Sequence, residues 1–129
     1  MTWNPLNAVS YARVHALPKP SGYCGRYVSN AIRAGGLNLP NTHHARDMGR
    51  TLEQAGFYEV HGNLREGDVA VIQSLGITGH TDGHTCIYDA HHRQWISDYW
   101  QTHGSGEEGM YSGPEYRKRR PAYKIYRHD

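Results

Sequence analysis

A cysteine and a histidine are the residues of this sequence that could carry out nucleophilic chemistry. Cys24 lies two residues after a turn signal at Gly22, and apolar residues recur behind it with helical spacing. We therefore expect Cys24 at the N-terminal end of a helix, where unpaired backbone N–H groups favour an anion. A thiol there ionises more readily, and the thiolate is the form that attacks carbonyls. The alternative is that Cys24 is a small buried apolar side chain.

A cysteine nucleophile needs a histidine base and a third group that fixes the imidazole ring. Among ten histidines, His84 opens an apolar segment directly after a glycine, so its side chain could project from the end of a sheet toward a helix N-terminus. His80, in the preceding glycine-rich loop, is the rival base. Asp98 is polar among apolar neighbours and is predicted to orient His84, with a simple turn cap as its alternative role.

The second cysteine, Cys86, lies two residues after His84 and is expected on the same strand face, one layer deeper. Two cysteines argue against a disulfide framework. The alternative is a single disulfide between Cys24 and Cys86, which would leave Cys24 without a free thiol for nucleophilic attack.

Three further residues are candidates for substrate contact: Tyr23, Trp100 and Gln101. Tyr23 adjoins the nucleophile and could help the backbone N–H of Cys24 to hold an oxyanion. Trp100 could form part of an aromatic groove floor, and Gln101 follows it near the end of the same strand. For the two aromatic residues, ordinary packing is the alternative.

The elements that must position these residues divide the chain into a helical part and a β part. Helices are predicted from Asn4–Pro5 to the region of Pro18, from Cys24 to a stop at Gly35–Gly36, and over about 45–55. The predicted strands cover 57–60, 67–73, 84–88, 94–99 and 122–127. The second is apolar enough to be central, the third and fourth form a hairpin, and 102–114 is a polar loop. This order predicts an α+β fold.

Length and composition limit the function further. A chain of 129 residues favours one domain over 1–129. No stretch approaches the roughly 18 to 20 apolar residues that cross a bilayer, so no membrane insertion is expected. Residues 1–5 lack the basic and apolar segments of a signal peptide, so we expect synthesis in the cytoplasm without one and export, if any, by another route.

Two other classes of function are weighed against cysteine chemistry. Zinc catalysis is disfavoured because the sequence has neither a His-Glu-x-x-His motif nor a Cys-x-x-Cys pair, so no metal or other cofactor is expected. The net charge of +2 comes mostly from the basic run 117–120. That run and nearby tyrosines suggest a non-enzymatic nucleic-acid-binding module as an alternative. A short basic run is usually a solvated face, however, so no nucleic-acid partner is expected.

The order of these motifs resembles the papain-like CHAP and NlpC-type peptidoglycan amidases and endopeptidases. The resemblance covers about 22–99: a cysteine opening a helix, Gly67-Asp68-Val69 leading a strand, Gly83-His84 opening another, and a polar residue on the next. The segments 95–98 and 123–127 are also similar to small CHAP-like proteins associated with bacterial type VI secretion. Tyr23 and Gly25 depart from the acidic or serine residue usual beside the nucleophile, and Asp98 from the usual glutamate or asparagine.

The resemblance implies a papain-like domain whose N-terminal helices pack on a central antiparallel sheet. It implies that Cys24 acylates, His84 is the base and Asp98 orients it, with amide bonds of peptidoglycan stem peptides as the substrate. The type VI similarity implies an antibacterial effector in the periplasm of a target cell, partnered by an immunity protein and a component of the secretion apparatus. The alternatives are a phage or self-remodelling wall hydrolase and a papain-like hydrolase of a protein substrate.

Overall fold

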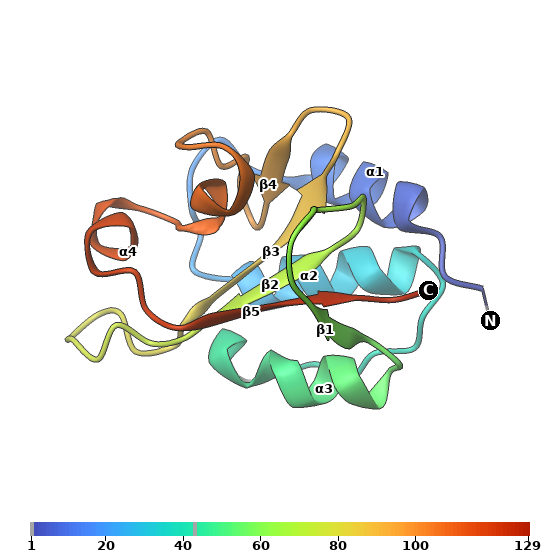
Figure 1. Cartoon of the computed structure of the whole chain (residues 1–129), viewed down its shortest axis with the longest axis horizontal. Coiled ribbons are helices and arrows are strands. Elements are labelled where there is room, and N and C mark those ends of the chain that lie inside the picture. The colour runs from blue at the N-terminus through green and yellow to red at the C-terminus, as the bar shows by residue number, and fades with distance from the viewer. Residues whose placement is uncertain (1, 43) are drawn as a thin grey trace.

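Helices precede strands along the chain in the computed structural model, which describes residues 2–42 and 44–129 (Figure 1). The helical part consists of α1 (Pro5–His15), α2 (Cys24–Ala34), the 3-10 turn η1 (Ala45–Asp47) and α3 (Met48–Gln54). The β part consists of β1 (Tyr58–Val60), β2 (Val69–Ile72), β3 (His84–Asp89), β4 (Gln94–Ile96) and β5 (Tyr123–Arg127). Between β4 and β5 lie the 3-10 helix η2 (Gly106–Met110) and α4 (Pro114–Arg119). The predicted α+β class is confirmed.

The strands form one antiparallel sheet in the order β1-β5-β2-β3-β4. The centre of the sheet is β2, and its four residues are all buried, as its β-branched composition predicts. The predicted hairpin of β3 and β4 is confirmed by the pairing of Ile87 with Ile96. Because Ile72 pairs with His84, that histidine lies at the end of β3.

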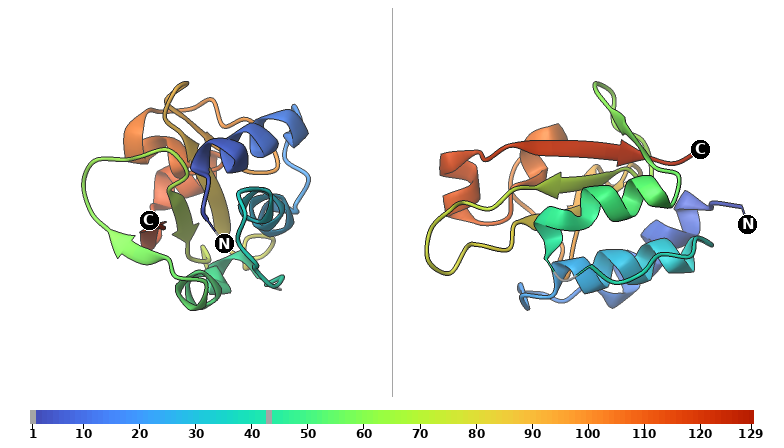
Figure 2. Two further views of the ribbon diagram at one scale, coloured as in Figure 1. Left: turned by 90° about the vertical axis from the view of Figure 1, so that its right-hand side faces the viewer. Right: turned by 90° about the horizontal axis from the view of Figure 1, so that it is seen from below.

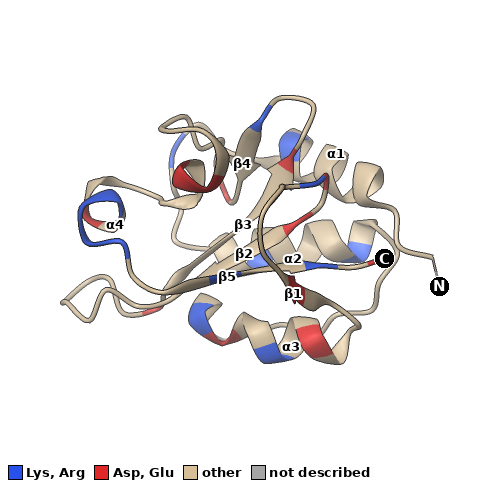
Figure 3. Cartoon of the chain, in the orientation of Figure 1, with Lys and Arg blue, Asp and Glu red and all other residues tan. Residues whose placement is uncertain are grey.

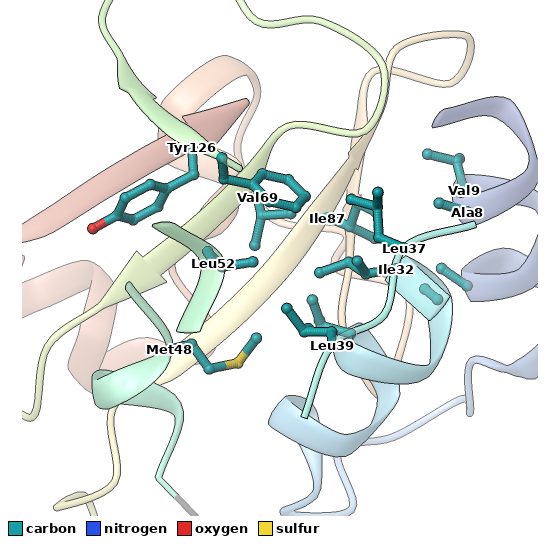
Figure 4. Packing of buried hydrophobic residues seen from close by; sticks show 14 of the residues in the cluster. Ala8, Val9, Ile32, Leu37, Leu39, Met48, Leu52, Val69, Ile87 and Tyr126 are labelled. Atoms are coloured by element: carbon teal, nitrogen blue, oxygen red, sulfur yellow. The ribbon is translucent and has the colours of Figure 1, made fainter. Parts of the chain in front are cut away.

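The N-terminal helices cover one face of the sheet, as the right-hand view of Figure 2 shows. Ile32, Leu52 and Met48 of these helices pack toward Val69 and Ile87 of the sheet (Figure 4). The removal of these side chains from water, at about 25 cal/mol per Å² of apolar surface, favours the docking of α2 on the sheet. The predicted packing of N-terminal helices on a central antiparallel sheet is confirmed.

Close contact between α1 and α2 fixes the helix that carries Cys24. The small residues Ala8 and Ala12 are buried on α1. At the end of α2, a Cβ on Gly35 would lie 2.5 Å from the ring of Trp3, so only glycine allows this approach. The side chain of Asn4 caps α1 by accepting a hydrogen bond from the Asn7 N–H at 3.0 Å.

The opposite face of the sheet is covered by the segment between β4 and β5, of which residues 102–114 were predicted as a polar loop. Instead, η2 and α4 bury Met110 and Tyr116 against Cys86 and Trp95. Both elements are too short to show helical periodicity in the sequence. None of the helices that the structure describes is both long and apolar enough to cross a bilayer.

Candidate active site

Cys24 is the first residue of α2, as predicted, and its side chain is partly exposed. The preceding residue, Tyr23, occupies the N-cap position but makes no side-chain capping hydrogen bond. The N-terminal N–H groups of the helix therefore receive no acceptor from the cap side chain, which leaves a positive electrostatic environment around the sulfur.

The loop before α2 is held by Asp98. One carboxylate oxygen of Asp98 accepts hydrogen bonds from the Ser21 N–H at 2.5 Å, the Ser21 hydroxyl at 2.8 Å and the Gly22 N–H at 3.1 Å. Burial opposes ionisation of Asp98, but these donors outweigh it and lower the pKa of the carboxyl group. Asp98 thus anchors the nucleophile loop, whereas the sequence predicted it as the hydrogen-bond partner of His84.

Gln101 occupies the place beside His84. The Nε2 atom of His84 lies 2.7 Å from the Oε1 atom of Gln101. The amide NH2 of Gln101 donates to the carbonyl oxygens of Gly109 at 2.8 Å and Met110 at 3.1 Å. Because those two carbonyls can only accept, the amide oxygen must face His84 and take the proton of Nε2. The other ring nitrogen, Nδ1, is then the one that can exchange a proton with Cys24.

Cys24 and His84 perturb each other's ionisation. Burial disfavours the Cys24 thiolate, but the charge of His84 and a hydrogen bond from it, together with the Thr85 N–H, lower the pKa of the thiol. Burial likewise disfavours a charged His84, but the charge and hydrogen bond of Cys24 raise the pKa of the imidazole well above its ordinary value. Both directions favour a thiolate–imidazolium pair.

Cys86 lies buried in β3, on the same face as His84, as predicted. Both cysteines are free, so the alternative of a Cys24–Cys86 bridge does not describe this structure. Burial is the main reason why the pKa of the Cys86 thiol is raised. Its sulfur lies 3.8 Å from the carbonyl oxygen of Met110. A hydrogen bond with His84 acts against the effect of burial, so Cys86 is a buried thiol that also contacts the candidate base.

A cleft of about 510 Å³ opens beside the sulfur of Cys24. Described residues that line it come from the start of α2 and from two loops: Gly22, Tyr23, Cys24, Gly25, Arg26, Asn41, Thr42, His44, Ala45 and Asp82. The predicted candidate Tyr23 is thus at the cleft. Trp100 instead packs against the core, and the buried Gln101 lies behind His84, so the predicted substrate contact of these two residues does not fit this geometry.

The rival base His80 lies in the loop before β3, and its ring packs edge-on against Tyr116 at 6.2 Å. The hydrogen bond to Cys24 comes from His84. Of the two candidates, His84 has the contacts that a base would need.

Over residues 2–42 and 44–129, one group of side chains could hold a metal ion: Glu66, Asp89 and His91, with ligand atoms within 4.8 Å of one another. It lies at the other end of β3 from His84. Asp89 already pairs there with Arg13 at 2.7 Å, and a guanidinium so close disfavours a second cation.

Solved structures similar to this chain link it to type VI secretion. One is the native effector–immunity complex Tae3–Tai3 from Ralstonia pickettii, with 42% identity and a TM-score of 0.88 over 98% of this chain and 100% of the other. This chain belongs to the Tae3 family of type VI effectors. A selenomethionine structure of the same complex matches at 44% identity and a TM-score of 0.83, over 94% of this chain and 99% of the other.

No protein-family model and no curated protein matches the chain. The Tae3 relationship confirms the predicted connection to type VI secretion. The similarity to the CHAP and NlpC-type enzymes stays a prediction.

Proposed function

We propose that this Tae3-family effector is a cysteine hydrolase, related to the CHAP and NlpC-type enzymes, that cuts amide bonds in the peptidoglycan stem peptides of a competing cell. Residues 1–129 form its single catalytic domain. The observation that carries the proposal is the position of Cys24 at the start of α2, hydrogen-bonded to His84 and in the lining of a cleft of about 510 Å³. A structural cysteine needs neither an ionised sulfur nor access to a ligand.

The reaction begins when the Cys24 thiolate attacks the carbonyl carbon of a stem-peptide amide. The negative charge that develops on the carbonyl oxygen is stabilised by the Cys24 N–H at the start of α2, and the loss of one such donor typically costs about 10²–10³ in rate. His84 gives its Nδ1 proton to the leaving amine, and the C–N bond breaks. His84 then takes a proton from water, and the resulting hydroxide attacks the thioester and regenerates the thiolate.

Gln101 and Asp98 have separate roles in this proposal. Gln101 holds the ring of His84 through Nε2, so that Nδ1 faces the sulfur throughout the cycle. Asp98 holds Ser21 and Gly22, and through them the start of α2. Different side chains therefore hold the two groups: Gln101 orients the base, and Asp98 positions the loop before the nucleophile.

The proposed partners follow from the family. The similar solved structures are effector–immunity complexes, and we propose an immunity protein for this chain as well, along with a component of the secretion apparatus that delivers it to the target periplasm. The nucleic-acid alternative is weakened by the charges around α4 (Figure 3). Arg119 pairs with Glu115, and Arg120 pairs with Glu108, so acidic neighbours offset part of the basic run.

Mass spectrometry of purified muropeptides tests the proposal. We expect new peptide fragments after incubation with the wild-type protein and none with Cys24→Ala. Cys86→Ala is the matched control: it removes the buried sulfur that also hydrogen-bonds to His84 but leaves the proposed nucleophile in place, so it should still produce the fragments. Equal digestion by the wild type and Cys24→Ala would show that Cys24 is not the nucleophile. The absence of digestion by the wild type would exclude these peptides as substrates.

A further inference from the structure

An arginine is among the described residues that line the cleft. Arg26 is the third residue of α2, two positions after the nucleophile, and its side chain is exposed. Its guanidinium carbon lies 4.9 Å from the ring centre of Tyr23, which also lines the cleft. A cation over an aromatic face is attracted to it, so Tyr23 restricts where the guanidinium can lie. Among the described residues, no carboxylate pairs with Arg26.

The described lining of the cleft also includes one acidic residue, Asp82. Its carboxylate contacts the Nδ1 atom of His44 at 2.7 Å and does not pair with Arg26. The side-chain oxygen of Asn41 accepts a hydrogen bond from Arg33 at 3.2 Å, so the amide NH2 is the part of Asn41 that remains to donate. Arg26 and Asn41 therefore both offer hydrogen-bond donors to an occupant of the cleft.

We infer that Arg26 binds a free carboxylate of the substrate peptide, close to the amide bond that Cys24 attacks. This inference rests on the proposed function and specifies which peptides the cleft selects. A guanidinium presents paired N–H donors that match the two oxygens of a carboxylate, so a stem peptide with a free carboxylate beside the cut amide bond would be held by Arg26. The stacking on Tyr23 reduces the freedom that Arg26 would lose when the carboxylate binds.

Two synthetic stem peptides that differ in a single group test this inference. One carries a free carboxylate next to the amide bond that is cut, and the other carries a carboxamide at the same atom. We expect the wild type to cut the carboxylate peptide with a kcat/KM about 10- to 100-fold higher, as for a hydrogen bond to a charged group. Arg26→Gln should lose this preference, and Arg26→Lys should keep part of it because the charge remains without the paired donors.

Arg50→Gln is the matched control. It removes the same charge from the exposed surface of α3, outside the residues that line the cleft, and should keep the wild-type preference. Equal cleavage of both peptides by the wild type, or an unchanged preference in Arg26→Gln, would overturn the carboxylate site while the hydrolase proposal stands. If the wild type cuts neither peptide, the proposed function fails and the carboxylate site fails with it.

Discussion

The two ends of the β3–β4 hairpin carry the same residue types in different electrostatic arrangements. Each end has a histidine, a glutamine and an aspartate. The end beside α2 has His84, Gln101 and Asp98, and the turn end has His92, Gln94 and Asp89. The contrast shows what separates a candidate catalytic cluster from a structural one.

At the turn end, the polar groups are bonded to one another. Asp89 accepts hydrogen bonds from the Nε atom of Arg13 at 2.7 Å and pairs with Nδ1 of His92 at 2.9 Å. Arg13 also donates to the side-chain oxygen of Gln94 at 2.6 Å. Burial opposes ionisation of Asp89, but these donors outweigh it and lower the pKa of the carboxyl group. The opposite charges are thus matched within the cluster.

At the α2 end, the charge of the His84 imidazolium faces the sulfur of Cys24. Gln101 holds one nitrogen of His84, and the hydrogen bond between His84 and Cys24 uses the same ring. The sulfur borders the cleft, so a ligand could reach it. Composition alone does not distinguish the two ends, whereas the presence of a nucleophile and an open cleft does. Paired substitutions at the two ends can test this difference.

The largest difference is expected between the two histidines. His84→Ala should lower kcat/KM on muropeptides by about 10²–10⁴-fold because it removes the general base and the partner of the thiolate. His92→Ala should leave the rate unchanged, since its ring contacts Asp89 far from the cleft. Steady-state kinetics on both variants measures the contrast. Comparable losses in the two would mean that the hairpin acts as one structural unit.

A smaller difference is expected between the two glutamines. Gln101→Ala removes a hydrogen bond to a charged ring, worth about 1.5–3 kcal/mol, so kcat should fall by about 10- to 150-fold with little change in KM. Gln94→Ala should lower kcat much less, because its amide donates only to the backbone carbonyl of Gln101, at 3.2 Å, and does not contact His84. Thermal melts of both variants distinguish misorientation of His84 from a general loss of stability. If Gln101→Ala raised KM and kept kcat, Gln101 would contact the substrate instead.

The two aspartates should differ least. Asp98→Asn and Asp89→Asn each weaken charge-assisted hydrogen bonds, and each should lower the free energy of unfolding by about 1.5–3 kcal/mol at pH 7. Because both carboxyl groups have lowered pKa values, the stability they provide is present above the unfolded pKa of about 4 and is lost as the pH falls. The difference in the free energy of unfolding between each variant and the wild type should therefore become smaller toward pH 3, as measured by urea denaturation.

Activity separates these two aspartate variants. Asp98→Asn should also reduce kcat, by less than about tenfold for a single weakened bond, because the loop before Cys24 loses an anchor. Asp89→Asn should not. Full activity in Asp98→Asn would mean that Ser21 and Gly22 hold their positions without the charge of the carboxylate.

The positions of Cys24 and His84 could be predicted because local signals determine them. Glycine before each residue, helical spacing after Cys24 and β-branched residues in the sheet all act over a few positions. The neighbour of His84 could not be predicted in this way. The strand expected over 94–99 ends at Ile96, and the chain then turns back, with the Ser97 N–H donating to the Tyr99 carbonyl at 3.1 Å.

That turn removes Asp98 from the strand on which the sequence analysis had placed it. After it, the Gln101 N–H donates to the Trp95 carbonyl at 3.0 Å, and the side chain of Gln101 comes beneath His84. The side-chain NH2 of Gln101 is held by hydrogen bonds to backbone carbonyls of η2, a segment without helical periodicity in the sequence. Backbone groups of an irregular segment carry no residue-type signal, so only the folded structure reveals this contact.

The two cysteines differ in burial, so the rate at which each is alkylated reports on a different part of the structure. A thiol-alkylating reagent added to the native protein can react with the partly exposed Cys24, whereas Cys86 is buried between the sheet and η2. The extent of Cys24 alkylation measures the fraction of molecules whose nucleophilic thiol is accessible and free. Alkylation of Cys86 proceeds only as fast as η2 separates from β3, so its rate reports the opening of the sheet's covered face.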